Sequence, residues 1–182
     1  MDTEEAILRR RTIHSFENKK VSEDLILKGI EAANHAPCHK LTFPWRYYSI
    51  GIKKRNELLK LAIELKSQKI VLGDKSKAVI EEKFLNPSHL LVATQILAKD
   101  DFTRKEDYAA CSCAIQNMAI LFSSLGINIK WSSGSITSNL KTYEIININP
   151  IFEEIIGFIW IGYGKKPLEI IRPLVAEVYK QI

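Results

Sequence analysis

The sequence has too little cysteine, glycine and proline for several classes of protein. Its three cysteines, an odd number, do not make a disulfide framework, and eight glycines with six prolines do not suggest a disordered chain. No apolar run approaches the roughly 20 residues that cross a bilayer. The acidic residues 1–5 also lack the apolar core of a secretory signal. We therefore expect no membrane association and a cytoplasmic location.

The composition is that of an ordinary globular protein. Of the 182 residues, 46% are hydrophobic and 26% are charged, so we expect a single domain over residues 1–182 with a core of its own. The net charge of +5 comes from lysines scattered among glutamates, without a known nucleic-acid recognition motif. This pattern favours a solvated basic surface, with no nucleic-acid partner, that suits an anionic cofactor or substrate.

Hydrophobic spacing and end signals predict a succession of helices and strands. The predicted helices cover residues 2–10, 22–36, 55–68, 108–125 and 138–146. The predicted strands cover residues 45–50, 89–98 and 155–161. The polar segment 73–88 predicts a short helix at most. Because no βαβ glycine fingerprint separates the strands, the pattern indicates an α+β fold rather than a doubly wound nucleotide fold.

The strongest periodic signal lies in the second half of the chain. Apolar residues recur there every three or four positions, at Tyr108, Cys111, Ile115, Met118, Phe122 and Leu125. This spacing predicts a long amphipathic helix that ends at Gly126. The stripe fits a central core helix, and it equally fits a helix that also packs across a dimer interface.

Residues 36–48 read APCHKLTFPWRYY and join a helix to an aromatic strand. Pro37 ends the helix, and Pro44 favours an extended backbone at Phe43. His35 and His39 flank this break. Pro37 interrupts their four-residue spacing and no third ligand follows, so we expect no metal site. Without further information they are ordinary polar residues at a helix end.

Two other stretches carry groups that suit a phosphorylated aromatic ligand. Arg10, Arg11 and Thr12 offer two guanidinium groups and a hydroxyl for a phosphate, although basic residues also favour the negative end of a helix. Residues 131–133 offer an indole and two hydroxyls, although an ordinary Ser/Gly turn after a buried tryptophan is the more usual explanation.

Four segments together resemble the nitroreductase family, which binds flavin mononucleotide (FMN), and especially its small single-domain bacterial members. These segments are RRRTIHSF (9–16), APCHKLTFPWRYY (36–48), DYAACSCAIQNMAILFSSLG (107–126) and IIGFIWIGYGKKP (155–167). The resemblance implies a mixed, mainly antiparallel sheet surrounded by helices. It also implies a homodimer with flavins in the interface.

The resemblance also implies a set of cofactor-binding residues. The family's Arg-Arg-Ser signature aligns with Arg10, Arg11 and Thr12, and His35 and His39 belong to a segment that approaches the flavin. The other implied contacts are Trp131, Ser132, Ser133 and the phosphate-binding Lys166. Relatives can carry arginine where this chain has Ser132, and many carry lysine where it has His14.

The function implied is that of an FMN-dependent oxidoreductase. NADH or NADPH would reduce the flavin and leave, and a nitroaromatic, quinone or similar acceptor would then enter the same cavity, in a ping-pong scheme. Such chemistry needs no catalytic side chain from the protein. Two alternatives stay open: a non-catalytic flavin-binding module that responds to redox state, and a basic nucleic-acid-binding domain.

Overall fold

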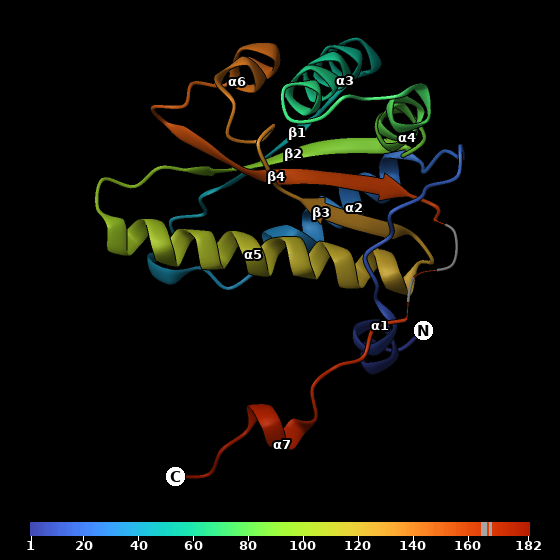
Figure 1. Cartoon of the computed structure of the whole chain (residues 1–182). Helices are drawn as coiled ribbons and strands as arrows, with labels where there is room; N and C mark the ends of the chain where they lie inside the picture. Colours follow the sequence, from blue (N-terminus) through green and yellow to red (C-terminus); the bar gives the residue numbers. More distant parts are fainter. Residues whose placement is uncertain (165–166, 168) are drawn as a thin grey trace.

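A four-stranded antiparallel sheet forms the middle layer of the protein (Figure 1). The computed structural model describes residues 1–164, 167 and 169–182. The strands lie in the order β1-β2-β4-β3, and every neighbouring pair is antiparallel. Their bounds are β1 Trp45–Ser49, β2 His89–Ile96, β3 Asn128–Ser132 and β4 Glu153–Gly162. The predicted α+β class with a mainly antiparallel sheet is confirmed.

Helices cover both faces of this sheet (Figure 1). On one face lie α2 (Glu23–Asn34) and α5 (Asp101–Ser124), with α1 (Thr3–Arg9) packed against α5. On the other face lie α3 (Ile52–Ser67), α4 (Asp74–Leu85) and α6 (Leu140–Ile146). Each face buries its own apolar cluster, so β2 between them is buried along six of its eight residues.

The long helix predicted from the apolar stripe is confirmed as a core helix. Cys111, Ile115, Met118 and Phe122 of α5 are buried against α2 and the sheet. A Cβ at Gly29 of α2 would overlap the Phe122 ring, so this glycine lets the two helices approach closely. The stripe's ends, Tyr108 and Leu125, are exposed.

The end of α5 follows from local hydrogen bonding. Gly126 has a φ of +70°, a left-handed conformation that glycine adopts without a steric penalty. Its N–H donates to Ser123 O at 3.1 Å, and Ile127 N–H donates to Phe122 O at 2.8 Å. These two bonds satisfy carbonyl groups that the helix itself leaves unpaired, as in a Schellman motif.

Apart from shifted boundaries, such as the start of α5 at Asp101, three local predictions differ from the structure. Segment 73–88 contains the twelve-residue helix α4, because Ile80 and Phe84, one turn apart, bury a narrow apolar face that the polar surroundings obscure. Residues 128–132, for which no strand is predicted, form β3. Phe43 has a φ of +45° instead of an extended backbone, and the 3-10 turn η1 (His39–Leu41) has further positive φ values.

Residues 169–182 leave the body of the protein beside α1 and carry the short helix α7 (Val175–Val178) (Figure 1). The large apolar side chains of this segment are exposed: Ile170, Ile171, Leu174, Val175, Val178, Tyr179 and Ile182. No helix in the described ranges has both the length and the apolar character needed to cross a membrane.

Candidate functional site

The candidate site lies along β3, which is at one edge of the sheet and pairs with the strand β4. The N-terminal segment runs past this free edge. Thr12 forms a parallel bridge with Ile129, and Phe16 forms an antiparallel bridge with Gly164. Glu17 N–H adds a 2.8 Å hydrogen bond to Tyr163 O. Residues 10–14 are thereby held beside a strand more than a hundred positions away in sequence.

A cavity of about 220 Å³ opens between this segment, α5 and β3, and we name it the Arg10 cavity. Its lining residues are Arg10, Thr12, Ser112, Ile115, Gln116, Ala119, Ile129 and Trp131. Three of the predicted site residues, Arg10, Thr12 and Trp131, are therefore brought together in one chain. The polar pair Ser112 and Gln116, one turn apart on α5, was not predicted, although its i, i+4 spacing is visible in the sequence.

The Trp131 indole packs against residues 156–157 of the adjacent strand β4. Its Nε1–H donates to Ile156 O at 3.2 Å, and a Cβ at Gly157 would overlap the indole nitrogen. The absence of a side chain at Gly157 therefore lets the indole approach β4 closely. Trp131 presents an aromatic wall to the Arg10 cavity in a defined orientation.

A second cavity, of about 180 Å³, lies on the opposite face of the sheet edge, and we name it the Lys83 cavity. Residues 132–136 form one wall, and α3 and α4 contribute Lys66 and Lys83. Trp160 and Phe158 form its floor. Lys83 Nζ lies 5.5 Å from the centre of the Trp160 ring, so the ammonium is held over an aromatic surface.

Trp131 and Ser132 are neighbours in β3, and the sequence predicts that both contact the cofactor. The structure places their side chains on opposite faces of the strand. Successive side chains of a strand point to opposite faces. Trp131 accordingly lines the Arg10 cavity, while Ser132 and the exposed Ser133 line the Lys83 cavity. Ser132 Oγ also accepts a 2.8 Å hydrogen bond from the Nε1–H of the buried Trp160.

Positive charge accumulates around both cavities without matching carboxylates. Burial, Arg172 and Arg11 lower the pKa of Arg10. Burial, Lys130 and Lys66 lower the pKa of Lys83 to about 8. Among the described residues none of these cations forms an ion pair with an acidic side chain.

Lys130 and His14 belong to the group of cations around Lys83. Lys130 Nζ lies 3.1 Å from His14 Nδ1, and Lys130 is the largest cause of a lowered pKa at His14. The neutral imidazole can accept a hydrogen bond from the ammonium at that distance. Cations therefore lie around both cavities at the edge of β3, and an anion bound beside them would relieve the repulsion within each group.

Arg11 has a structural role within the chain. Its Nη1 donates to Leu8 O at 2.6 Å and to Arg10 O at 2.9 Å. These carbonyls lie at the end of α1, where a cation stabilises the negative end of the helix. Stabilisation of the negative end of a helix therefore accounts for Arg11. Arg10, in contrast, lines the cavity.

His35 and His39 lie elsewhere on the surface. His35 follows the last residue of α2, is exposed, and has its Nε2 3.1 Å from Glu31 Oε1. It borders a cavity of about 450 Å³ formed with α1 and a different side of α5. His39 is exposed in η1. Within one chain neither histidine lines the Arg10 cavity or the Lys83 cavity.

Sequence reasoning missed Lys83, Lys130 and Arg172. Lys83 belongs to the segment whose helical pattern is weak, and its depressed pKa depends on burial that the sequence does not reveal. Lys130 precedes Trp131 and could have been found once β3 was recognised. The predicted phosphate contact at Lys166 lies outside the described residues.

Comparison with known proteins places these observations in a family. A model described as "Nitroreductase family" matches residues 7–163. The Bacillus subtilis protein YfhC is 31% identical to this chain over 175 residues. The match covers 90% of this chain and 85% of YfhC, whose name assigns it provisionally to the NAD(P)H nitroreductases. A nitroreductase-like family protein from Bacillus cereus superposes with a TM-score of 0.86 at 26% identity, over 100% of this chain and 96% of that one. A nitroreductase with bound FMN from Bacteroides fragilis, 19% identical, shares the fold with a TM-score of 0.76 over 100% of this chain and 99% of that one.

Replacing Ser132 tests whether its hydroxyl stabilises the fold by accepting the hydrogen bond from Trp160, or serves only to contact a ligand. Ser132→Ala leaves the buried Trp160 Nε1–H without an acceptor, which should lower the free energy of unfolding by about 1–3 kcal/mol. The exposed Ser133→Ala is the matched control and should change it by less than about 0.5 kcal/mol. Urea denaturation of the ligand-free proteins measures both. Equal effects of the two substitutions would contradict the assignment.

Proposed function

The chain belongs to the nitroreductase family, and from this we propose that it is an FMN-dependent oxidoreductase passing electrons from NADH or NADPH to a small acceptor. The observation that carries the proposal is the set of cations beside β3 that form no ion pair with a carboxylate among the described residues, which fits an anionic and elongated ligand. The aromatic wall at Trp131 adds a surface for a planar ring. When bound, FMN would accept hydride from the nicotinamide and pass electrons to a nitroaromatic or quinone in a second half-reaction.

The phosphate end of FMN would bind beside Arg10. Its guanidinium can donate two parallel hydrogen bonds to phosphate oxygens, and the Thr12 hydroxyl adds a neutral donor in the same cavity. Arg11 and Arg172 lie close enough to Arg10 to lower its pKa, so they add positive potential there. We include Lys166 in this phosphate set as a further proposal.

The polar edge of the flavin ring would face the Lys83 cavity. Lys83 and the Lys130–His14 pair supply cationic donors, and Ser133 supplies an exposed hydroxyl. Fixed donors near this edge stabilise the negative charge that reduction places on the ring. The protein thus binds, orients and neutralises the cofactor, while no nucleophile or general base of its own is required.

We further propose that the enzyme is a homodimer in which a second copy completes the site. His35 and His39 lie apart from the Arg10 cavity within one chain, so they would reach the flavin only from the neighbouring copy. The exposed apolar residues of segment 169–182 offer surface for such an association. A monomer that retains full FMN occupancy at high dilution would contradict this arrangement.

The decisive experiment is steady-state oxidation of NADH and NADPH by the FMN-saturated protein, with menadione and a nitroaromatic compound as separate acceptors. We expect flavin absorption in the purified protein, turnover with at least one donor, and parallel double-reciprocal plots. Bound FMN without turnover would favour the non-catalytic flavin-binding alternative. Failure to bind FMN at all would refute both.

Arg10→Ala should weaken FMN binding about 10- to 100-fold, because a charge-assisted hydrogen bond contributes about 1.5–3 kcal/mol. The exposed Arg9, which pairs with Glu5 at 2.9 Å, provides the matched control, and Arg9→Ala should change affinity less than about twofold. Quenching of flavin fluorescence gives both dissociation constants. Unchanged affinity in Arg10→Ala would remove this residue from the site.

The lowered pKa of Lys83 predicts a pH dependence of FMN affinity. In the free protein the ammonium loses its proton near pH 8. A ligand that accepts its hydrogen bond raises this pKa again, so binding takes up a proton above pH 8. Affinity should therefore fall between pH 7 and 9.5, by at most about tenfold per pH unit.

Two variants distinguish the titration of Lys83 from that of other groups as the cause of the pH dependence of FMN affinity. Lys83→Met should bind FMN more weakly at pH 7 and show no further fall, whereas Lys83→Arg should stay charged and keep its affinity throughout. Fluorescence titration at several pH values measures both. A fall of the wild-type size in Lys83→Met would assign the pH dependence to another group.

A further inference from the structure

A separate cavity of about 360 Å³ lies at the start of α3, and we name it the Arg55 cavity. Three segments form it: the loop with Lys19 and Lys20, the first turn of α3, and the turn from α4 to β2. It shares no lining residue with the Arg10 cavity or the Lys83 cavity. Its volume is that of a small-molecule site.

The first turn of α3 has an unusual charge pattern. Negative groups normally occupy the first turn of a helix, where backbone N–H groups point outward without partners. α3 has no acidic residue there, and its first residue, Ile52, is followed by Lys53, Lys54 and Arg55. Its N-cap residue, Gly51, provides no side chain to accept from these N–H groups. The positive end of this sixteen-residue helix therefore has no side-chain cap among the described residues, and Lys20 and Arg55 line the cavity beside it.

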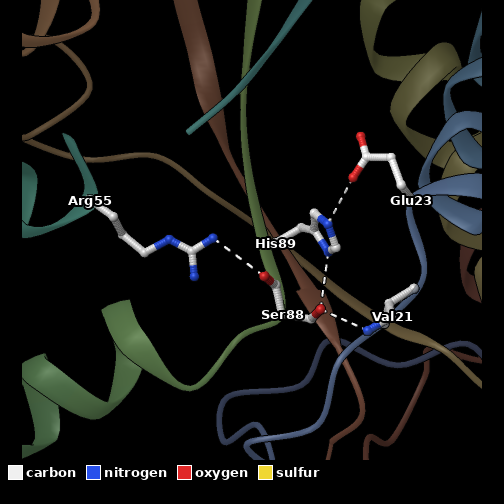
Figure 2. A network of polar contacts seen from close by, with 5 residues as sticks. All are labelled: Val21, Glu23, Arg55, Ser88 and His89. Atoms are coloured by element: carbon white, nitrogen blue, oxygen red, sulfur yellow. Dashed lines mark hydrogen bonds and ion pairs between the residues drawn. The ribbon is translucent and has the colours of Figure 1, made fainter. Parts of the chain in front are cut away.

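Arg55 provides the second, independent observation. Its side chain lines the cavity although the residue is only 7% exposed, and burial lowers the pKa of its guanidinium. Nη1 donates to Pro87 O at 2.7 Å, but Nη2 reaches Ser88 O only at 3.5 Å (Figure 2) and Nε has no partner among the described residues. A buried guanidinium with no carboxylate and incomplete hydrogen bonding is costly unless an anion approaches it.

A hydrogen-bonded chain holds the walls of the cavity together (Figure 2). Ser88 Oγ accepts from Val21 N–H at 2.7 Å and lies 3.0 Å from His89 Nδ1. His89 Nε2 in turn lies 3.2 Å from Glu23 Oε2. Glu23 contributes the one carboxylate among the lining residues, and His89 engages it. Among the described residues neither Lys20 nor Arg55 forms an ion pair with a carboxylate.

We propose that the Arg55 cavity binds a phosphate group, either free or carried by a small phosphate monoester, separately from the flavin. The uncapped N–H groups of α3 would donate to the phosphate oxygens, as helix N-termini do at other anion sites. Lys20 and Arg55 would supply the balancing charge. Lys19, whose Nζ lies 4.1 Å from the centre of the Tyr163 ring, fixes the adjoining loop.

The test uses protein saturated with FMN, so that the Arg10 cavity is filled, and measures thermal unfolding at constant ionic strength. Inorganic phosphate and AMP are the two probes, and adenosine is the uncharged control. We expect phosphate, AMP or both to raise the melting temperature in a saturable manner, and adenosine to have no effect. A rise with AMP alone would assign the site to a monoester.

Gly51 permits a matched pair of variants. Its φ of −68° and ψ of 163° suit a capping residue, and a Cβ there would contact nothing within 4 Å. Gly51→Asp should raise the melting temperature without phosphate, because its carboxylate caps the helix, and should weaken phosphate binding at least tenfold. Gly51→Ala should retain the phosphate response, and Lys20→Ala should reduce it.

Three results would overturn the proposal. The first is a wild-type protein with no saturable response to either phosphate compound. The second is a Gly51→Asp variant that responds like the wild type. The third is a phosphate response that the FMN-free protein shows and the FMN-saturated protein loses, which would assign phosphate to the Arg10 cavity.

Discussion

The pairing of the N-terminal segment with the free edge of β3 is the constraint on which the candidate site depends. The bridge from Thr12 to Ile129 holds Arg10 and His14 beside a strand that the chain reaches only after α5. Without this pairing, the side chains of Arg10 and His14 would be ordinary solvated groups. With it, Arg10 lines the cavity formed with α5 and β3, and His14 lies beside Lys130.

The sheet edge also explains how one ligand could use both cavities. Trp131 and Ser132 are adjacent in sequence but lie on opposite faces of β3, because strand side chains alternate. A ligand lying along the edge could contact both faces, whereas a ligand within either cavity alone could not. Burial is the largest cause of the lowered pKa values of Arg10 and Lys83, and repulsion from neighbouring cations adds to it in each cavity. This repulsion stores free energy that an anionic ligand recovers on binding.

Sequence reasoning succeeded where local signals were strong. The stripe from Cys111 to Phe122 and the capping glycine at Gly126 identified α5, since spacing and turn chemistry are local properties. It failed at β3, where an ordinary turn is the more usual explanation of residues 131–133. It also failed at Phe43, where the tertiary packing of the η1 region overrides the preference of a residue before proline.

The sequence by itself determined the α+β class, most of the helices and strands, and the residue types able to hold a phosphorylated aromatic cofactor. Only the tertiary structure decided which of these residues meet: Arg10, Thr12 and Trp131 share a cavity, Arg11 caps α1, and His35 lies on another side of α5. It also introduced Lys83, whose pKa near 8 results from burial among other cations. The physical reason is that spacing in sequence encodes the face of a helix or strand, whereas burial and charge repulsion arise only when distant segments pack together.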